Sequence, residues 1–186
     1  PAHGRDVRFV LTTELSCIYK KHGRTRRLHL LVFMPTTGGV KRLIAALERQ
    51  ECNLRSDGRP ILGIDAKSVL EMALVADSKA LVVPAHAWTP WFSVFGSESG
   101  FDSLEECFEE LTPHIHAIET GLSSDPAMNR RLTALDRVAL ISNSDAHGVR
   151  KLGREANVFD LETPSFDAIA RILRERDRKR FLGTIE

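Results

Sequence analysis

The amino-acid sequence predicts an α/β protein in which helices cover a mostly parallel sheet. Apolar runs of strand length recur along the 186-residue chain, and amphipathic helical patterns separate them. The runs are nearly continuous in hydrophobic residues, as in strands that are buried on both faces. An open doubly wound sheet and a closed β/α barrel both satisfy this pattern, and both bind ligands at the carboxyl ends of their strands.

Seven segments have the composition and the boundaries of strands. In chain order they are residues 8–16 (RFVLTTELS), 27–34 (RLHLLVFM), 80–87 (ALVVPAHA), 116–120 (HAIET), 138–144 (VALISNS), 157–162 (NVFDLE) and 181–185 (FLGTI).

Five helices are predicted from periodicity and from N-terminal signals. The second begins after Asp65 as its N-cap, the third opens with the capping-box pattern Ser103-x-x-Glu106, and the fourth has a proline in its first turn behind Asp125. The first follows the sequence TTGG and the last begins near TPSF. Their inward stripes are Val40, Leu43, Ile44 and Leu47 in the first, and Phe166, Ile169, Ile172 and Leu173 in the last.

The composition is that of an ordinary globular domain, with 42% hydrophobic residues, 27% charged residues and a net charge of +1. No apolar run approaches the roughly 20 residues of a membrane span, and no signal-peptide pattern opens the sequence. The three cysteines match no zinc-binding spacing and are interpreted as reduced thiols. We therefore expect a cytoplasmic protein without a membrane partner. The sequence lacks an initiator Met and stops where a new strand begins, which predicts one domain, residues 1–186, truncated at both ends.

Ionisable side chains follow four of the apolar runs at the point where each run ends. Glu14 follows RFVLTT, His86 follows ALVVPA, Glu119 follows HAI, and Asp145 and His147 follow VALISNS. Carboxylates and imidazoles are the ligands that zinc and manganese take in proteins, and several strand ends can bring them together. The set therefore predicts a metal site.

Each of these residues also has a structural interpretation. His86 could be a hydrogen-bonded structural residue, Asp145 a helix N-cap and Glu14 the partner of an arginine. His29 lies inside its apolar run, so a core histidine and a metal ligand are both open for it.

Residues 86–103 (HAWTPWFSVFGSESGFDS) form an aromatic loop that holds both tryptophans, Trp88 and Trp91. The loop either pins itself to the fold by aromatic packing or provides a wall on which a base stacks. No phosphate-binding glycine motif follows any strand, so a nucleotide cofactor is not expected.

The quoted ligand motifs, SDAH, PAH and the Glu that follows the first strand, resemble metal-binding motifs of the PHP (polymerase and histidinol phosphatase) superfamily. The longer strings LTTELSCIYKK, SDGRPILGID, PAHAWTPWFSVFGSESGFDSLEECF, ETGLSSDPAMNRRLTALDR and SNSDAHGVRKLGREANVFD are similar to its endonuclease Q-like branch. The resemblance covers almost the whole chain.

The resemblance implies a distorted seven-stranded β/α (TIM-like) barrel that is incomplete at its N-terminus, because the H-x-H motif that opens PHP domains is missing before LTTEL. It implies a cluster of two to three zinc or manganese ions in the intact parent protein. The implied metal ligands are Glu14, His29, His86, Asp145 and His147, of which Glu14, Asp145 and His147 are the catalytic candidates. We expect the truncated chain alone to bind metal weakly and to be inactive.

The implied activity is that of an endonuclease that cuts DNA on the 5′ side of deaminated bases or abasic sites. Trp88 and Trp91 would contact the base, and the DNA backbone would be held by Lys20, Lys21, Arg26, Arg27, Lys151 and Arg154. Two alternatives stay open: a small-molecule phosphoesterase of the histidinol-phosphatase type, and a non-catalytic fragment or nucleic-acid-binding module with an incomplete cluster.

Overall fold

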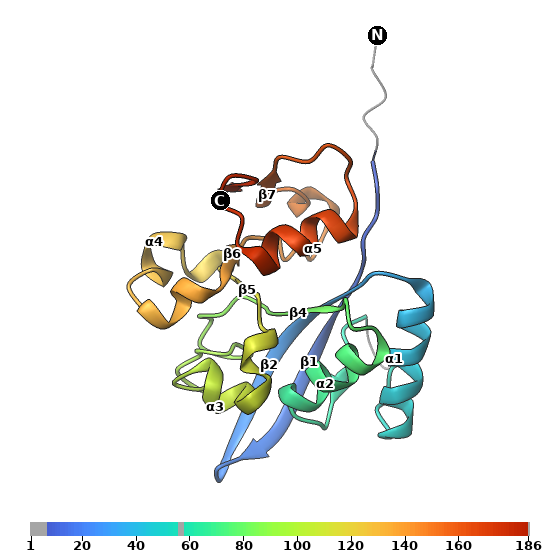
Figure 1. Ribbon diagram of the computed structural model, residues 1–186. Coiled ribbons are helices and arrows are strands. Elements are labelled where there is room, and N and C mark those ends of the chain that lie inside the picture. Colours follow the sequence, from blue (N-terminus) through green and yellow to red (C-terminus); the bar gives the residue numbers. More distant parts are fainter. Residues whose placement is uncertain (1–6, 56–57, 186) are drawn as a thin grey trace.

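The structure is a computed structural model that describes residues 7–55 and 58–185 (Figure 1). Its longest strands are β1 (Leu11–Lys21) and β2 (Arg24–Met34), which cross the lower part of the view in Figure 1. The other strands are β3 (Ile61–Leu62), β4 (Leu81–Pro84), β5 (Ala117–Glu119), β6 (Ala139–Ile141), β7 (Ala156–Phe159) and β8 (Phe181–Ile185). The helices are α1 (Thr37–Arg49), α2 (Ala66–Ala76), α3 (Leu104–Phe108), α4 (Pro126–Asn129) and α5 (Phe166–Glu175), with short 3-10 turns between them.

β1 and β2 form a long antiparallel hairpin around a two-residue turn. His22 and Gly23 have φ angles of 51° and 73°, and two positive φ angles in succession define the type I′ turn that matches the twist of paired strands. The register pairs Glu14 with Leu31 and Ser16 with His29. Residues that face each other in this way lie on one face of the hairpin, and their chain neighbours lie on the other.

The strands of the described residues form three separate sheets, and most of their pairings are antiparallel. The first sheet has the order β3-β1-β2-β4, the second pairs β5 with β6 and the third pairs β7 with β8. Only β1–β3 and β5–β6 are parallel. The predicted mostly parallel sheet is therefore wrong. For β1 and β2 the reason is their two-residue connection, which can join only antiparallel strands. The seven-stranded barrel is not confirmed by these pairings, although the mixed α/β fold class is.

Four of the five predicted helix starts are confirmed by their N-cap hydrogen bonds, whereas α1 begins at Thr37, within the TTGG sequence rather than after it. The Asp65 carboxylate accepts from the Ser68 N–H at 2.9 Å, and the Ser103 hydroxyl accepts from the Glu106 N–H at 3.0 Å. Asp125 and Ser165 cap α4 and α5 in the same way. Each cap satisfies a backbone donor that would otherwise lack a partner at the helix start, which stabilises the helix by about 1 kcal/mol.

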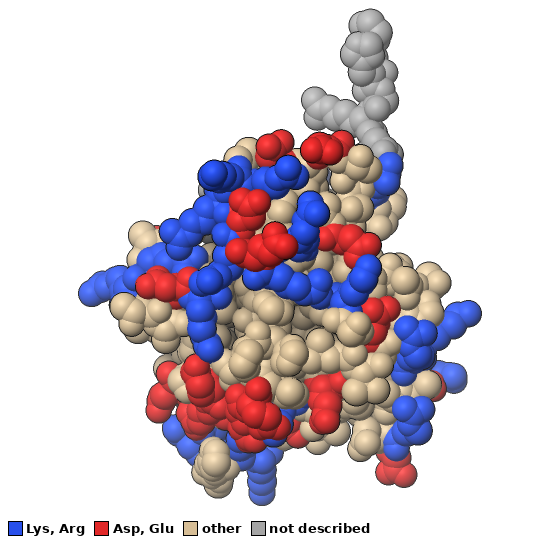
Figure 2. All heavy atoms as spheres, viewed as in Figure 1, with Lys and Arg blue, Asp and Glu red and all other residues tan. Residues whose placement is uncertain are grey.

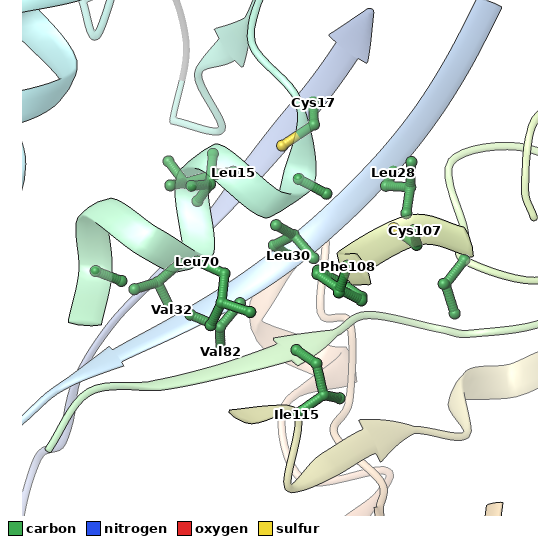
Figure 3. Close-up of a cluster of buried hydrophobic side chains, with 14 of the residues drawn as sticks. Leu15, Cys17, Leu28, Leu30, Val32, Leu70, Val82, Cys107, Phe108 and Ile115 are labelled. Carbon is green, nitrogen blue, oxygen red and sulfur yellow. The ribbon is translucent and has the colours of Figure 1, made fainter. Parts of the chain in front are cut away.

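Two hydrophobic clusters lie on opposite faces of the β1–β2 hairpin. Figure 3 shows the larger one, in which Leu15, Leu30 and Val32 of the hairpin pack against Leu70 of α2 and Phe108 of α3. The smaller cluster joins the opposite face of β2 to β4, β5, β6 and α5. Both faces of the second half of β2 are therefore covered, which explains why residues 28–34 are apolar except for His29. No helix among the described residues is long and apolar enough to span a membrane.

Candidate metal centre

Glu14 and His29 meet because the hairpin register places them diagonally on one face. His29 is directly opposite Ser16, two residues from Glu14 on β1. Strand residues two apart point to the same side, so the Glu14 carboxylate reaches the imidazole. Oε1 of Glu14 lies 2.9 Å from Nδ1 of His29. His29 is buried, and Glu14 is partly buried.

His86 completes this group from the segment that follows β4. Its Nε2 lies 3.0 Å from Nδ1 of His29 and 3.7 Å from Oε1 of Glu14. The Ala85 N–H donates to the His29 carbonyl at 3.0 Å, so the β2–β4 pairing extends to the residue before His86. His86 itself has a φ of 30°, a conformation that is rare for a residue with a side chain and that occurs often at functional sites.

These three side chains have the chemistry of a metal site. Two imidazole nitrogens and one carboxylate oxygen converge, and all three ligand atoms lie within 4.8 Å of one another. Such a nitrogen and oxygen set suits zinc or manganese. Nδ1 of His29 faces a carboxylate oxygen and a second imidazole nitrogen at once, and a divalent metal between these atoms would accept a lone pair from each of them. The residues present therefore fit a bound divalent metal.

The electrostatics of the group favour an ionised Glu14. Burial by itself raises the pKa of Glu14, but hydrogen bonds to His29 and His86 and the charges of His29 and Arg59 hold that pKa well below its usual range. Burial lowers the pKa of His29. Burial also disfavours the charged form of His86, yet its contact with Glu14 and the charges of Glu119, Glu14 and Asp145 raise its pKa.

Hydrogen bonds to Thr89 and Glu119 hold His86 in place. Its Nδ1 lies 3.0 Å from the Thr89 hydroxyl, which itself donates to the Trp91 carbonyl at 2.8 Å. A hydroxyl that donates elsewhere can accept from Nδ1–H, and that tautomer turns the Nε2 lone pair toward Glu14 and His29. The His86 N–H donates to Oε2 of Glu119 at 2.8 Å.

Glu119 is a strand-end carboxylate that lies outside the ligand set predicted from the sequence. It is buried, and its second oxygen accepts from the Asn143 side chain at 2.7 Å. Burial raises the pKa of Glu119. Thr89 and Asn143 were not predicted at all, because a lone threonine or asparagine in a loop carries no sequence signal. The glutamate could have been included by the same strand-end argument that selected His86.

Asp145 and His147 lie outside the three-residue group in the described residues. Asp145 follows β6 with a φ of 43° and is near enough to His86 for its charge to raise the His86 pKa. The His147 side chain is 64% exposed, and its Nδ1 lies 2.9 Å from the Asp145 carbonyl. Their role as ligands stays a prediction. Arg154 holds this loop by donating to the Ser144 carbonyl at 2.8 Å.

The aromatic loop combines the two interpretations that the sequence left open. Trp88 is packed at 4.8 Å on Phe95 and donates its indole N–H to Asn129 at 2.8 Å, so it serves to pin the loop. Phe92 stacks on the His29 ring at 4.7 Å, and its carbonyl accepts from the His29 N–H at 3.0 Å. Trp91 is 47% exposed and carries the Arg27 guanidinium 5.0 Å from its ring centre.

The basic residues that were predicted to hold the DNA backbone lie in different environments in the structure. Lys20, Lys21, Arg26 and Arg27 belong to paired strands near the hairpin tip, rather than to a turn that follows a strand end. The predicted role of Arg26 in DNA binding is wrong. Arg26 is buried over the Phe101 ring, and its guanidinium donates to the Gly100 carbonyl and to Glu106. It is therefore unavailable to a DNA backbone. Lys21 pairs with Glu109 at 2.6 Å. Lys151 is exposed in the turn after Asp145.

The fold and the site thus define a mixed α/β protein in which histidine and glutamate side chains that could bind a metal converge near its strands. The PHP-associated family matches residues 134–177. An uncharacterised protein of Bacillus subtilis, YqxK, is 31% identical over 158 residues, which is 84% of this chain and 39% of that protein. An uncharacterised protein of Methanocaldococcus jannaschii is 34% identical over 79 residues, which is 41% of this chain and 9% of that protein.

Two solved structures are similar over most of the chain. The crystal structure of the lesion-specific endonuclease Q of Pyrococcus furiosus matches with a TM-score of 0.74 and 32% identity over 88% of this chain. Endonuclease Q in complex with a 27-mer duplex that has an abasic lesion at the active site matches with the same TM-score over 87% of this chain. Our chain spans 38% of each of those chains. These similarities support a relation to the PHP superfamily and to its endonuclease Q-like branch.

Proposed function

We propose that this chain forms part of a metal-dependent endonuclease that cleaves DNA on the 5′ side of deaminated bases or abasic sites. The observation that supports this most directly is the convergence of Glu14, His29 and His86 within a chain so similar to a lesion-specific endonuclease. The similar chains are more than twice as long, so the activity is proposed for the whole parent protein. We place it in the cytoplasm.

Glu14, His29 and His86 would hold one metal ion of the proposed cluster, and Asp145 and His147 would join them in the intact protein. Zinc or manganese, when bound, lowers the pKa of a bound water and stabilises negative charge on a phosphodiester. Within this chain, Glu14 supplies negative charge that offsets the metal, and Thr89 fixes the His86 tautomer.

Trp91 and Arg27 are the substrate contacts that we propose from the loop. The half-exposed indole offers a surface for stacking, and the guanidinium above it can contact a phosphate or stack on a base. Both residues belong to segments that contact the metal centre. The Arg27 N–H donates to the Ser99 carbonyl of the aromatic loop, and Phe92 of the same loop stacks on His29.

The decisive experiment incubates the full-length parent protein and Mn²⁺ or Zn²⁺ with oligonucleotides that contain uracil, hypoxanthine, an abasic site or no lesion. We expect cuts 5′ of the lesions and none in the undamaged strand. Equal cleavage of all four, or hydrolysis of a small phosphomonoester alone, would refute the damage-specific activity.

Metal analysis tests the ligands separately from activity. Glu14→Gln is expected to lose bound metal, whereas the control Glu71→Gln, on the exposed side of α2, should keep it. If Asp145→Ala binds as much metal as the wild-type protein, Asp145 is not a metal ligand.

A further inference from the structure

A cavity outside the metal centre lies between α4, the start of β6, the end of α5 and the start of β8. It has a volume of about 170 Å³, and three of its lining residues are arginines: Arg130, Arg176 and Arg178. Figure 2 shows Lys and Arg side chains gathered over the part of the surface formed by α4 and α5. Asp136 is the one carboxylate that lines it among the described residues. The cavity therefore carries an excess of positive charge.

Most of this charge is not neutralised by carboxylates. Arg130 donates to the carbonyls of Leu135 and Val138, and its nearest approach to the Asp136 carboxylate is 3.8 Å. Arg176 donates at 3.2 Å to the main-chain carbonyl of Asp136. Main-chain carbonyls orient a guanidinium but leave its charge in place. The fixed arginines thus present charge to any anion that enters.

The floor of the cavity is apolar, and Val138, Ile172 and Phe181 contribute to it. An apolar floor lowers the local dielectric and strengthens the attraction between a guanidinium and an anion. Arginine binds phosphate with two parallel hydrogen bonds, which also fixes the orientation of the anion. The volume is below the roughly 300 Å³ of small-molecule pockets, so it suits a single phosphate group rather than a whole nucleotide.

The backbone at Arg176 supports a role beyond packing. Arg176 is the C-cap of α5, with φ of 53° and ψ of 44°. This left-handed conformation is usually occupied by glycine, and a residue with a side chain costs about 1 kcal/mol there. An arginine at this position places its guanidinium at the cavity.

We propose that this cavity is a phosphate-binding site, separate from the metal centre. None of the residues that line the cavity belongs to the group of Glu14, His29 and His86. The phosphate comes either from a nucleic-acid backbone that passes this face or from a small phosphorylated ligand.

Thermal unfolding in EDTA, with inorganic phosphate or chloride at equal ionic strength, tests the site. Phosphate should raise the Tm of the wild-type chain, because a ligand that binds only the folded state stabilises it. Arg178→Gln and Arg176→Gly should each weaken phosphate binding about tenfold, by removing one charge-assisted contact. Arg171→Gln, an exposed arginine of α5 outside the cavity, is the control and should behave as wild type.

Arg176→Gly also separates binding from folding. Glycine suits the left-handed C-cap, so this variant should unfold in chloride at a temperature no lower than wild type. If phosphate raises the Tm of all four proteins equally, the proposal is overturned, because phosphate is then an adventitious ion only.

Binding of an undamaged duplex, followed by anisotropy, identifies the source of the phosphate. Weaker binding by Arg178→Gln than by Arg171→Gln assigns the site to nucleic acid. If Arg178→Gln weakens the binding of inorganic phosphate but not of the duplex, the site is assigned to a small phosphorylated ligand. If the variant loses neither duplex binding nor phosphate binding, the proposal is overturned. None of these results depends on endonuclease activity.

Discussion

Gly121 lies so close to His86 that a Cβ atom at position 121 would be 2.6 Å from the Cβ of His86. Real Cβ atoms do not approach so closely, and the obstruction includes the His86 backbone at 2.8 Å. Gly121 also has a φ of 63°, which favours glycine. The glycine after the β5 carboxylate therefore permits the position that His86 takes beside Glu14 and His29.

Gly121→Ala is expected to displace His86 and to weaken zinc or manganese binding at least tenfold. The expected loss of stability is about 1–3 kcal/mol, from strain and steric overlap. Isothermal titration with metal and a denaturation curve measure the two effects. Gly23→Ala is the control, since Gly23 has a similar φ of 73° but no atom near its Cβ position. Equal metal binding by both variants would show that the contact does not position His86.

Thr89→Val removes the hydroxyl next to His86 Nδ1 at nearly constant volume. We expect metal affinity to fall by about 10–100-fold, because the ring loses the partner that fixes its tautomer. Thr89→Ser keeps the hydroxyl and should retain most of the affinity. Competition with a chelating dye gives the constants. If valine and serine variants bind metal equally well, the hydrogen bond is not needed for the site.

Arg26 and Arg27 are adjacent in sequence but are expected to respond differently to mutation. Arg26→Gln should destabilise the fold by about 2–3 kcal/mol, because it removes buried charged hydrogen bonds to Gly100 and Glu106. Arg27→Gln should change stability little and weaken DNA binding instead. Urea denaturation and oligonucleotide binding separate these effects. Unchanged stability of Arg26→Gln would contradict the buried anchoring role.

His116 is expected to make stability depend on pH. Burial, together with the charges of Arg174 and His114, lowers the pKa of His116 to about 4 from its ordinary 6.5. Between these values the unfolded chain binds a proton that the folded chain does not, so stability falls as the pH falls from 6.5 to 4.

His116→Gln should flatten this part of the stability curve, measured by denaturation at closely spaced pH values. The exposed His22 at the hairpin turn offers the control His22→Asn, which should keep the wild-type slope. An unchanged slope in His116→Gln would assign the pH dependence to other groups.

Several elements could be predicted from the sequence because their signals are local. The caps of α2 and α3 at Asp65 and Ser103, and the apolar run of β2, follow from short patterns. The hairpin was missed although its signal is also local. The sequence KKHGRT was interpreted through its charge, whereas His22-Gly23 between two strand-like runs is a turn signal.

The candidate site could be predicted only in part. The strand-end rule selects Glu14 and His86, but Glu14 lies inside β1 and meets His29 through strand register rather than at a strand end. The burial of Arg26 could not be foreseen, because its partners Gly100 and Glu106 lie more than 70 residues along the chain. No local pattern encodes contacts at that separation.

The two-residue turn between β1 and β2 also bears on the order in which the site forms during folding. Glu14 and His29 are brought together by a hairpin, an element that pairs within about 1–10 μs and needs no distant part of the chain. His86 is 57 residues from His29, and closing that larger loop costs more chain entropy. We therefore expect two of the three side chains to come together early as a local structure, and the third to join them only when β4 docks on β2.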